Sequence, residues 1–127
     1  MVGGSVEIAG GMRWFNDAPA VYLYRDFVDF RKAINGLVAI IESEMGLSPY
    51  QDAIFVFCNR GRDKLKVIHW DRTGYVLWYK RLEESKFMWP RRHDSAVMTL
   101  SGEQWQWLLL GYDILSMQGH RMLQYGT

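Results

Sequence analysis

The sequence of 127 residues has almost no cysteine, no long apolar run and almost no net charge. Its single cysteine, Cys58, excludes an internal disulfide framework and fits a reducing compartment. No apolar stretch approaches the roughly eighteen residues that would span a bilayer. The first residues also lack the basic start and the apolar core of a secretory signal. These absences predict a cytoplasmic protein without membrane contact.

Motifs for metal and small-molecule chemistry are equally scarce. The three histidines and Cys58 have no metal-ligand spacing, and no glycine-rich loop precedes a helix as in a phosphate-binding loop. His69 lies among apolar residues, which favours a hydrogen-bonded core histidine, and Cys58 alternates with core residues as a small buried hydrophobe. We therefore expect no cofactor and no metal. The enzymatic alternative is a small metal-dependent nuclease that uses Asp63, Asp71 and Glu83, although aspartates in turns commonly have backbone roles.

The length and the 49% hydrophobic content predict a single domain over residues 1–127, with the glycine-rich residues 1–11 disordered. Residues 20–25 are β-branched and aromatic, which predicts a strand. Apolar residues recur at steps of three and four over 29–45, which predicts an amphipathic helix. Asp29 would cap this helix, and Gly46 would end it.

Three apolar runs follow, at 53–59, 64–71 and 75–82, and the turn-forming loops RGRD and RTG separate them. This pattern predicts a meander. Ser101 and Gln104 have the spacing of a capping box before a short C-terminal helix. The expected fold class is α+β, an antiparallel three- to four-stranded meander with one amphipathic helix on its aliphatic face and a short C-terminal helix.

The turn chemistry also predicts which side chains face each other. A three-residue loop with Gly74 in the left-handed conformation pairs Asp71 with Tyr75 and so places Lys66 opposite Lys80. A four-residue loop at 60–63 places Phe55 beside Ile68 and Phe57 beside Lys66. One face of the sheet is then aliphatic and receives the amphipathic helix: Ile54, Val56, Cys58, Leu65, Val67, Leu77 and Tyr79. The other face is basic and aromatic: Phe55, Phe57, Lys66, Ile68, Trp70, Trp78 and Lys80.

Positive charge is concentrated in residues 53–92, which hold ten Lys/Arg and four Asp/Glu, a net charge of +6 in a chain whose total is +1. Cations interleaved with aromatic residues suit phosphate attraction and base stacking. Like charges opposite each other on paired strands are destabilising, so a lysine pair at 66 and 80 calls for an anion nearby.

A nucleic acid or an acidic partner protein would supply that anion. Two alternatives are a solvated surface neutralised by the chain's own carboxylates and a face covered by the C-terminal helix with its tryptophans. The predicted binding residues are Arg60, Arg62, Lys64, Lys66, Trp70, Arg72, Trp78, Lys80 and Arg81.

Three stretches carry a family resemblance: VYLYRDFVDFRKAINGL, DAIFVFCNRGRDKLKVIHWDRTGYVLWYKRLEESKFMWP and TLSGEQWQWLLLGYD. Over residues 21–113 they resemble the second-reading-frame accessory protein, often called TnpB, of the insertion sequence 66 family of bacterial transposable elements. The most specific positions are Asp29, Arg31, Lys32, Phe55, Phe57, Asn59, Arg60, Lys66, Trp70, Asp71, Gly74, Lys80, Arg81, Leu82, Glu83, Phe87, Trp89 and Pro90.

The resemblance implies a role in DNA transposition beside a separate protein that carries the catalytic transposase domain, but it supplies no biochemical activity. We expect a non-enzymatic accessory factor that binds the transposase of the same element, element-end DNA or both, through the basic aromatic face and the loop at 60–62.

Overall fold

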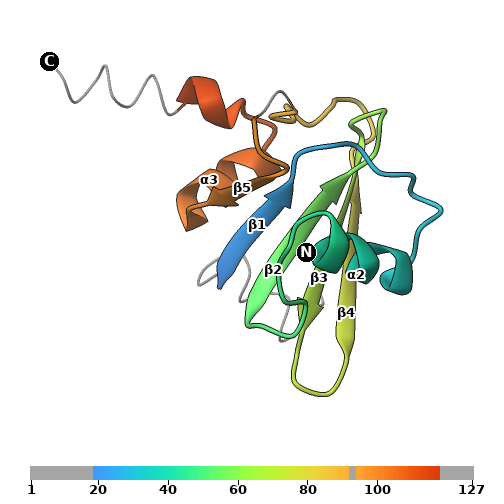
Figure 1. Cartoon of the computed structure of the whole chain (residues 1–127). Coiled ribbons are helices and arrows are strands. Elements are labelled where there is room, and N and C mark those ends of the chain that lie inside the picture. Colours follow the sequence, from blue (N-terminus) through green and yellow to red (C-terminus); the bar gives the residue numbers. More distant parts are fainter. Residues whose placement is uncertain (1–18, 92–93, 118–127) are drawn as a thin grey trace, which may run out of the picture.

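The computed structural model describes residues 19–91 and 94–117 (Figure 1). The segment 1–11, expected to be disordered, lies outside the described residues. The elements follow the order β1 (Ala20–Tyr24), α2 (Ile34–Ser43), β2 (Ala53–Cys58), β3 (Lys64–Trp70), β4 (Tyr75–Arg81), β5 (Val97–Leu100) and α3 (Gly102–Leu109). A last helical turn occupies 114–117. The α+β class is confirmed, and no helix within the described parts of the chain is long and apolar enough to cross a membrane.

The five strands form one mixed sheet in the order β4-β3-β2-β1-β5 (Figure 1). Strands β2, β3 and β4 make the predicted antiparallel meander, but β1 runs parallel to β2, and β5, which was not predicted, pairs antiparallel with β1. A parallel neighbour requires a long crossover connection, which the segment containing α2 provides. The purely antiparallel sheet was therefore only partly correct.

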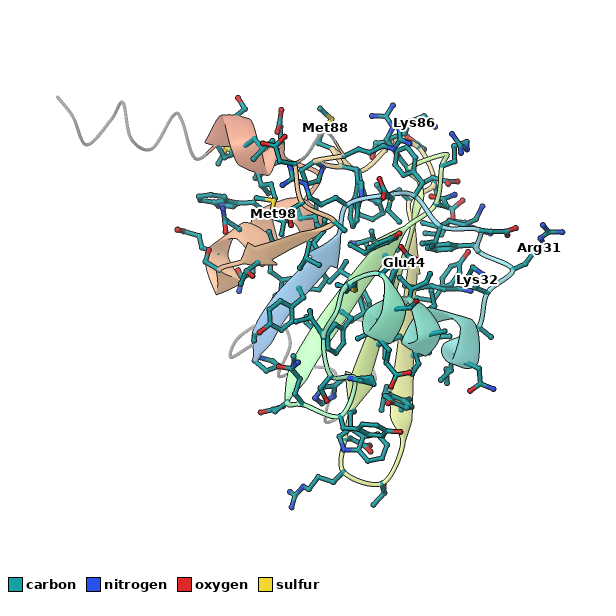
Figure 2. The ribbon with its side chains drawn as sticks, viewed as in Figure 1. Arg31, Lys32, Glu44, Lys86, Met88 and Met98 are labelled. Carbon is teal, nitrogen blue, oxygen red and sulfur yellow. The ribbon has the colours of Figure 1, made fainter. Side chains whose placement is uncertain are left out.

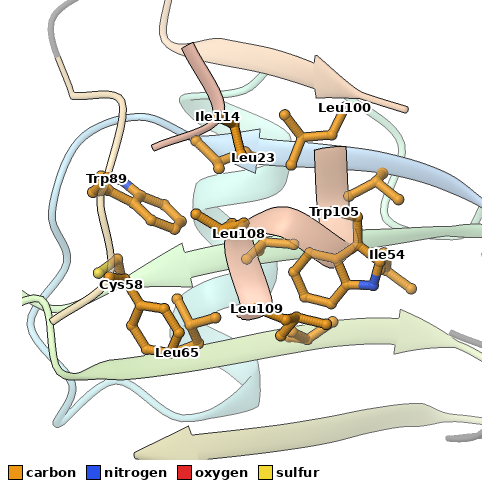
Figure 3. Packing of buried hydrophobic residues seen from close by; sticks show 14 residues of the cluster. Leu23, Ile54, Cys58, Leu65, Trp89, Leu100, Trp105, Leu108, Leu109 and Ile114 are labelled. Carbon is orange, nitrogen blue, oxygen red and sulfur yellow. The ribbon is translucent and has the colours of Figure 1, made fainter. Parts of the chain in front are cut away.

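Both faces of the sheet are covered. Helix α2 packs Leu37 and Ile41 into a cluster with Phe55, Phe57 and Ile68. The other face lies beneath α3 and the segment at 87–89, and Figure 3 shows the α3 side chains above the strands. Every residue of β2 is buried, as expected of a continuous apolar strand with both faces covered.

The prediction of which sheet face the amphipathic helix covers is wrong. The aliphatic residues Ile54, Val56 and Leu65 pack under α3, whereas α2 covers the face that carries Phe55 and Phe57. Alternation along a strand shows which residues share a face. It does not decide which of two apolar faces a given helix takes.

Helix α2 is also shorter than predicted, because it begins at Ile34 and not at Asp29. The preceding loop is held to the sheet, since the ammonium of Lys66 donates to the carbonyls of Phe30 (2.9 Å) and Lys32 (2.8 Å). The Asp29 carboxylate accepts the backbone N–H of Arg31 (2.9 Å) in a local turn and does not cap the helix. The expected helix end is confirmed, because Gly46 adopts a φ of +67° there.

The β3–β4 pairing differs from the prediction by one residue. Trp70 pairs with Tyr75, so the loop at 71–74 has four residues, and it is Arg72 (φ 84°), not Gly74, that takes a positive φ. The Asp71 carboxylate organises this turn by accepting the N–H groups of Thr73 (3.3 Å) and Gly74 (3.2 Å). A shift of one residue moves every side chain of β4 to the opposite face.

Two other local predictions are confirmed. The Ser101 hydroxyl accepts the N–H of Gln104 (3.1 Å), while the Gln104 side chain accepts the N–H of Ser101 (2.8 Å), so the capping box forms at the start of α3. The four-residue loop before β3 gives the expected pairing of Phe57 with Lys66.

Candidate functional site

Loops at one end of the sheet gather cations from separate parts of the chain. Strands β1, β2 and β4 end there, and β3 begins there. Five of these cations are linked by the contacts described below, and we call them the basic end: Arg60, Arg62, Lys64, Arg81 and Lys86. Figure 2 shows Lys86 at this end, with Arg31 and Lys32 on the loop between β1 and α2.

Asn59 closes the loop between β2 and β3. Its amide donates to the Asp63 carboxylate (2.6 Å) and accepts the backbone N–H groups of Asp63 (3.1 Å) and Lys64 (3.0 Å). Arg62 lies in the left-handed region, with a φ of 60°. The side-chain amide thus adds to the backbone bond from the Asn59 N–H to the Lys64 carbonyl (3.3 Å) and holds Arg60 and Arg62 in a defined turn.

The chain after β4 is fixed against the same loop. The backbone N–H of Phe87 donates to the Arg62 carbonyl (2.6 Å), and the Lys86 ammonium donates to the Gly61 carbonyl (2.9 Å). The Phe87 side chain is fully buried and anchors this segment in the core. Lys64 and Arg81 are direct partners in the β3–β4 pair. The five cations therefore belong to one connected unit.

Only part of this positive charge is neutralised locally. Lys64 lies 3.7 Å from Asp63, and Arg81 lies 3.0 Å from Glu83. Such solvent-exposed pairs are weak and easily exchanged for other partners. The hydrogen bond from Asn59 lowers the pKa of Asp63, so this carboxylate is charged at neutral pH.

Arg60 and Arg62 have no carboxylate within salt-bridge distance among residues 19–91 and 94–117. The basic end therefore keeps an excess of positive charge.

Two shallow grooves flank this loop. One, of about 470 Å³, lies between the β1–α2 loop and the β2–β3 loop and is lined by Phe27, Val28, Asp29, Phe30, Asn59, Arg60 and Gly61. The other, of about 200 Å³, is lined by Arg62, Met88, Trp89, Pro90, Arg91, Asp113 and Leu115. Arg60 lines the first groove and Arg62 lines the second, so an anionic group that enters either groove would meet a guanidinium of the β2–β3 loop.

Lys66, predicted to face a partner, is 8% exposed and is part of the fold. Its ammonium donates to the carbonyls of Phe30 and Lys32 and lies 4.9 Å from the centre of the Phe30 ring. Burial lowers the pKa of this lysine. Lys66 pairs with Tyr79 and not with Lys80, so the opposed lysine pair does not exist.

The other predicted binding residues fall into separate regions. Trp78 packs edge-to-face with Trp105 of α3 (6.5 Å), and Lys80 donates to the Leu109 carbonyl at the end of that helix (3.4 Å). Trp78 is therefore covered by the C-terminal helix, which was one of the two alternatives to a binding face. Trp70 and Arg72 lie at the opposite end of β3.

Of the nine predicted residues, the structure groups Arg60, Arg62, Lys64 and Arg81 at one end of the sheet. Lys86 was not among the nine predicted binding residues. The only signal for it was its place in the basic segment 53–92.

The carboxylates of the nuclease alternative do not converge. Asp63 precedes β3 and Asp71 follows it, so seven strand residues separate them, which corresponds to roughly 25 Å at about 3.3 Å per residue. Glu83 lies beyond the end of β4, on the side of Asp63. No group of three or more His, Cys, Asp or Glu suited to a metal occurs within the part of the chain that the structure describes. The separation counts against this two-metal cluster.

Comparison with known proteins identifies relatives. The uncharacterized protein y4jC of Sinorhizobium fredii is 42% identical over 86 residues, which cover 68% of this chain and 73% of that protein. The uncharacterized protein y4hO of the same organism is 32% identical over 93 residues, which cover 73% of this chain and 80% of that protein. No solved structure matches significantly.

The chain also matches a protein family. The sequence model described as IS66 Orf2 like protein matches residues 19–119, which include every strand and helix named above. This match supports an accessory role in transposition and confirms the resemblance seen in the sequence. The chain belongs to the family of IS66 Orf2-like proteins.

Proposed function

We propose that this protein acts in transposition by contacting the phosphate backbone of element DNA through the basic end. The observation that carries the proposal is the pair Arg60 and Arg62, which are held on a closed loop beside three further cations and have no carboxylate partner of their own among the described residues. Lys and Arg side chains that neutralise phosphates supply most of the sequence-independent affinity for DNA.

Burial of the aromatic residues favours phosphate contact over base stacking. Phe55, Phe57 and Ile68 have no exposed surface, so these residues cannot stack on bases or contact a partner protein. The cations of the loops remain exposed or half-buried. Binding by this end would follow charge and backbone shape rather than base sequence.

The transposase of the same element is the second candidate partner. The groove beside Arg60 has apolar walls from Phe27 and Phe30 and a cationic wall from Arg60. That combination suits an acidic or amphipathic protein segment as well as a phosphate.

An electrophoretic mobility assay with element-end DNA tests the proposal, with and without transposase and over a range of salt concentrations. The affinity should fall steeply with salt, with a log-log slope of about −0.9 for each phosphate neutralised. If a complex forms only in the presence of transposase, the basic end would be assigned to binding of the transposase and not of DNA. No complex in either arm at low salt would refute the proposal.

Two arginines provide a matched pair of variants. Arg62 and Arg72 both have positive φ, at 60° and 84°, and they lie at opposite ends of β3. Asparagine tolerates this backbone region, so Arg62→Asn and Arg72→Asn each remove one charge without adding strain. Arg62→Asn should weaken DNA binding and reduce the salt slope by about 0.9, whereas Arg72→Asn should change little. Equal effects of the two variants would show that the basic end is not the contact surface.

A further inference from the structure

Strand β4 forms one edge of the sheet (Figure 1), so about half of its backbone N–H and C=O groups point away from the sheet. The N–H of Asp71 donates to the Gly74 carbonyl (3.0 Å), and the N–H of Leu82 donates to the Asp63 carbonyl (2.7 Å). In an antiparallel pair, hydrogen-bonded residue pairs alternate with non-hydrogen-bonded pairs. These two bonds therefore assign Val76, Trp78 and Lys80 to the ladder with β3. The residues that direct their N–H and C=O groups away from the sheet are Tyr75, Leu77, Tyr79 and Arg81.

The other edge of the sheet, β5, is closed locally. The N–H of Arg25 donates to the Ala96 carbonyl (2.9 Å), so Val97 and Thr99 are the outward residues of β5. The Ser95 hydroxyl accepts the N–H of Val97 (3.3 Å) and donates to its carbonyl (3.2 Å). Within residues 19–91 and 94–117, β5 thus leaves one outward residue whose backbone groups have no hydrogen-bond partner, Thr99, whereas β4 leaves four.

The β4 edge lacks two of the features that prevent strand addition, proline and a bulge, and its two cations, Lys80 and Arg81, lie at its last two positions. No proline occurs in Tyr75–Arg81, and the register with β3 is continuous, without a bulge. Val76 is 40% exposed and Tyr79 is 48% exposed. Unpaired edges of this kind are templates for another strand.

We propose that the strand which pairs with this edge is β4 of a second copy of this chain, antiparallel, about a two-fold axis at Trp78. With the axis at Trp78, the outward residues of the two copies pair with one another. Tyr75 pairs with Arg81 of the second copy, and Leu77 pairs with Tyr79 of the second copy. Between them, Val76 faces Lys80 of the second copy, and Trp78 faces its own equivalent. A two-fold interface requires a surface that is complementary to itself.

The charge pattern of β4 meets that requirement. With full overlap of the two strands, each cation faces an uncharged residue, and Arg81 lies beside the Tyr75 ring, which suits a cation–π contact. A shift of four residues would instead place Lys80 opposite itself, and any shift shortens the overlap. The aromatic and aliphatic side chains of β4 would continue across the interface.

Sedimentation analysis of the full-length protein at concentrations from about 1 to 200 µM tests this inference. A dimer with a dissociation constant in the micromolar range dissociates on dilution across these concentrations. A reversible monomer–dimer equilibrium is expected. A protein that stays monomeric throughout this range refutes the pairing. The refutation would hold even if an extended segment of another protein bound to the β4 edge.

A charge exchange at Val76 tests the register. Val76→Lys places two lysine pairs across the interface and should weaken the dimer by about twofold to thirtyfold, whereas Val76→Glu places glutamate opposite Lys80 and should strengthen it by a similar factor. Changes in the same direction for both variants would overturn the proposed register.

A proline pair tests the edge itself. Tyr79→Pro removes an outward N–H without breaking the ladder with β3, and Thr99→Pro does the same on β5. Tyr79→Pro should abolish the dimer and Thr99→Pro should preserve it, with circular dichroism to confirm that both variants fold. Should Tyr79→Pro fail to fold, the two Val76 variants decide. Equal effects of the two prolines would refute the assignment to β4.

Discussion

Replacement of Lys66 by alanine is predicted to destabilise the protein, and the sign of this effect separates the sequence-based interpretation from the structure. An opposed pair of lysines would be relieved by Lys66→Ala, so stability would stay unchanged or rise by a few tenths of a kcal/mol. In the structure, the lysine is buried and joins β3 to a loop more than thirty residues away in the chain through the carbonyls of Phe30 and Lys32. Its loss should therefore weaken the fold.

The expected cost follows from these contacts. Two hydrogen bonds from an ammonium contribute about 1.5 kcal/mol each, and the contact with the Phe30 ring adds about 0.5 to 1 kcal/mol. Desolvation of the ammonium, which lowers its pKa, opposes these gains. The Phe30 and Lys32 carbonyls can also regain water, since neither residue is buried. We therefore expect a loss of about 2 to 3 kcal/mol in the free energy of unfolding.

Urea unfolding measures this loss, and two further variants interpret it. Lys66→Met keeps an aliphatic side chain but removes the donor, so it isolates the hydrogen bonds from the packing of the stem. Lys80→Ala is the control, because the Lys80 ammonium has one long contact, at 3.4 Å, to Leu109. It should cost less than about 0.5 kcal/mol. Equal costs for Lys66→Ala and Lys80→Ala, with unchanged denaturant dependence, would refute the reasoning.

Two other predictions concern the two faces of the sheet. Leu37→Ala removes a fully buried side chain of α2 and should lower the free energy of unfolding in urea by about 2 to 5 kcal/mol. In double-mutant cycles it should couple more strongly with Ile68→Val, which lies on the face under α2, than with Val67→Ala, which lies on the other face. The reverse order would show that α2 covers the opposite face of the sheet. Burial raises the pKa of the Cys58 thiol to about 12, so a thiol reagent at pH 8 should label this cysteine only after unfolding. Because the unfolded thiol ionises first, the free energy of unfolding should fall as pH rises from about 9 toward 12, and Cys58→Ala should lack this part of the fall. Rapid labelling of the native protein would contradict the burial.

Much of the local structure was predictable because its causes lie close together in the chain. The capping box of Ser101 and Gln104 and the helix end at Gly46 each depend on a few adjacent residues, and both were correct. The β2–β3 register was also correct, because a short loop determines it. The β3–β4 register failed by one residue, since the Asp71 side chain satisfies the turn's N–H groups and so takes Asp71 out of the strand.

The candidate site shows the same division. Sequence composition identified Arg60, Arg62, Lys64 and Arg81 as binding candidates, because charge can be counted along the chain. It did not separate these residues from Arg72 at the far end of β3. It also could not add Lys86, whose place beside Gly61 depends on the path of the chain after β4.

The sequence by itself determined strands β1 to β4, the capping box at Ser101, the helix end at Gly46, the basic segment and the family, because each of these depends on residue type and short spacing. Only the tertiary structure decided that β1 runs parallel to β2, that α2 and α3 cover opposite faces, and that Lys66 is an internal tether. Both faces of the sheet are apolar, so periodicity shows that each must be covered but not by which helix. The helix that covers each face is set by the chain's crossover and by contacts between residues far apart in sequence, which no local pattern contains.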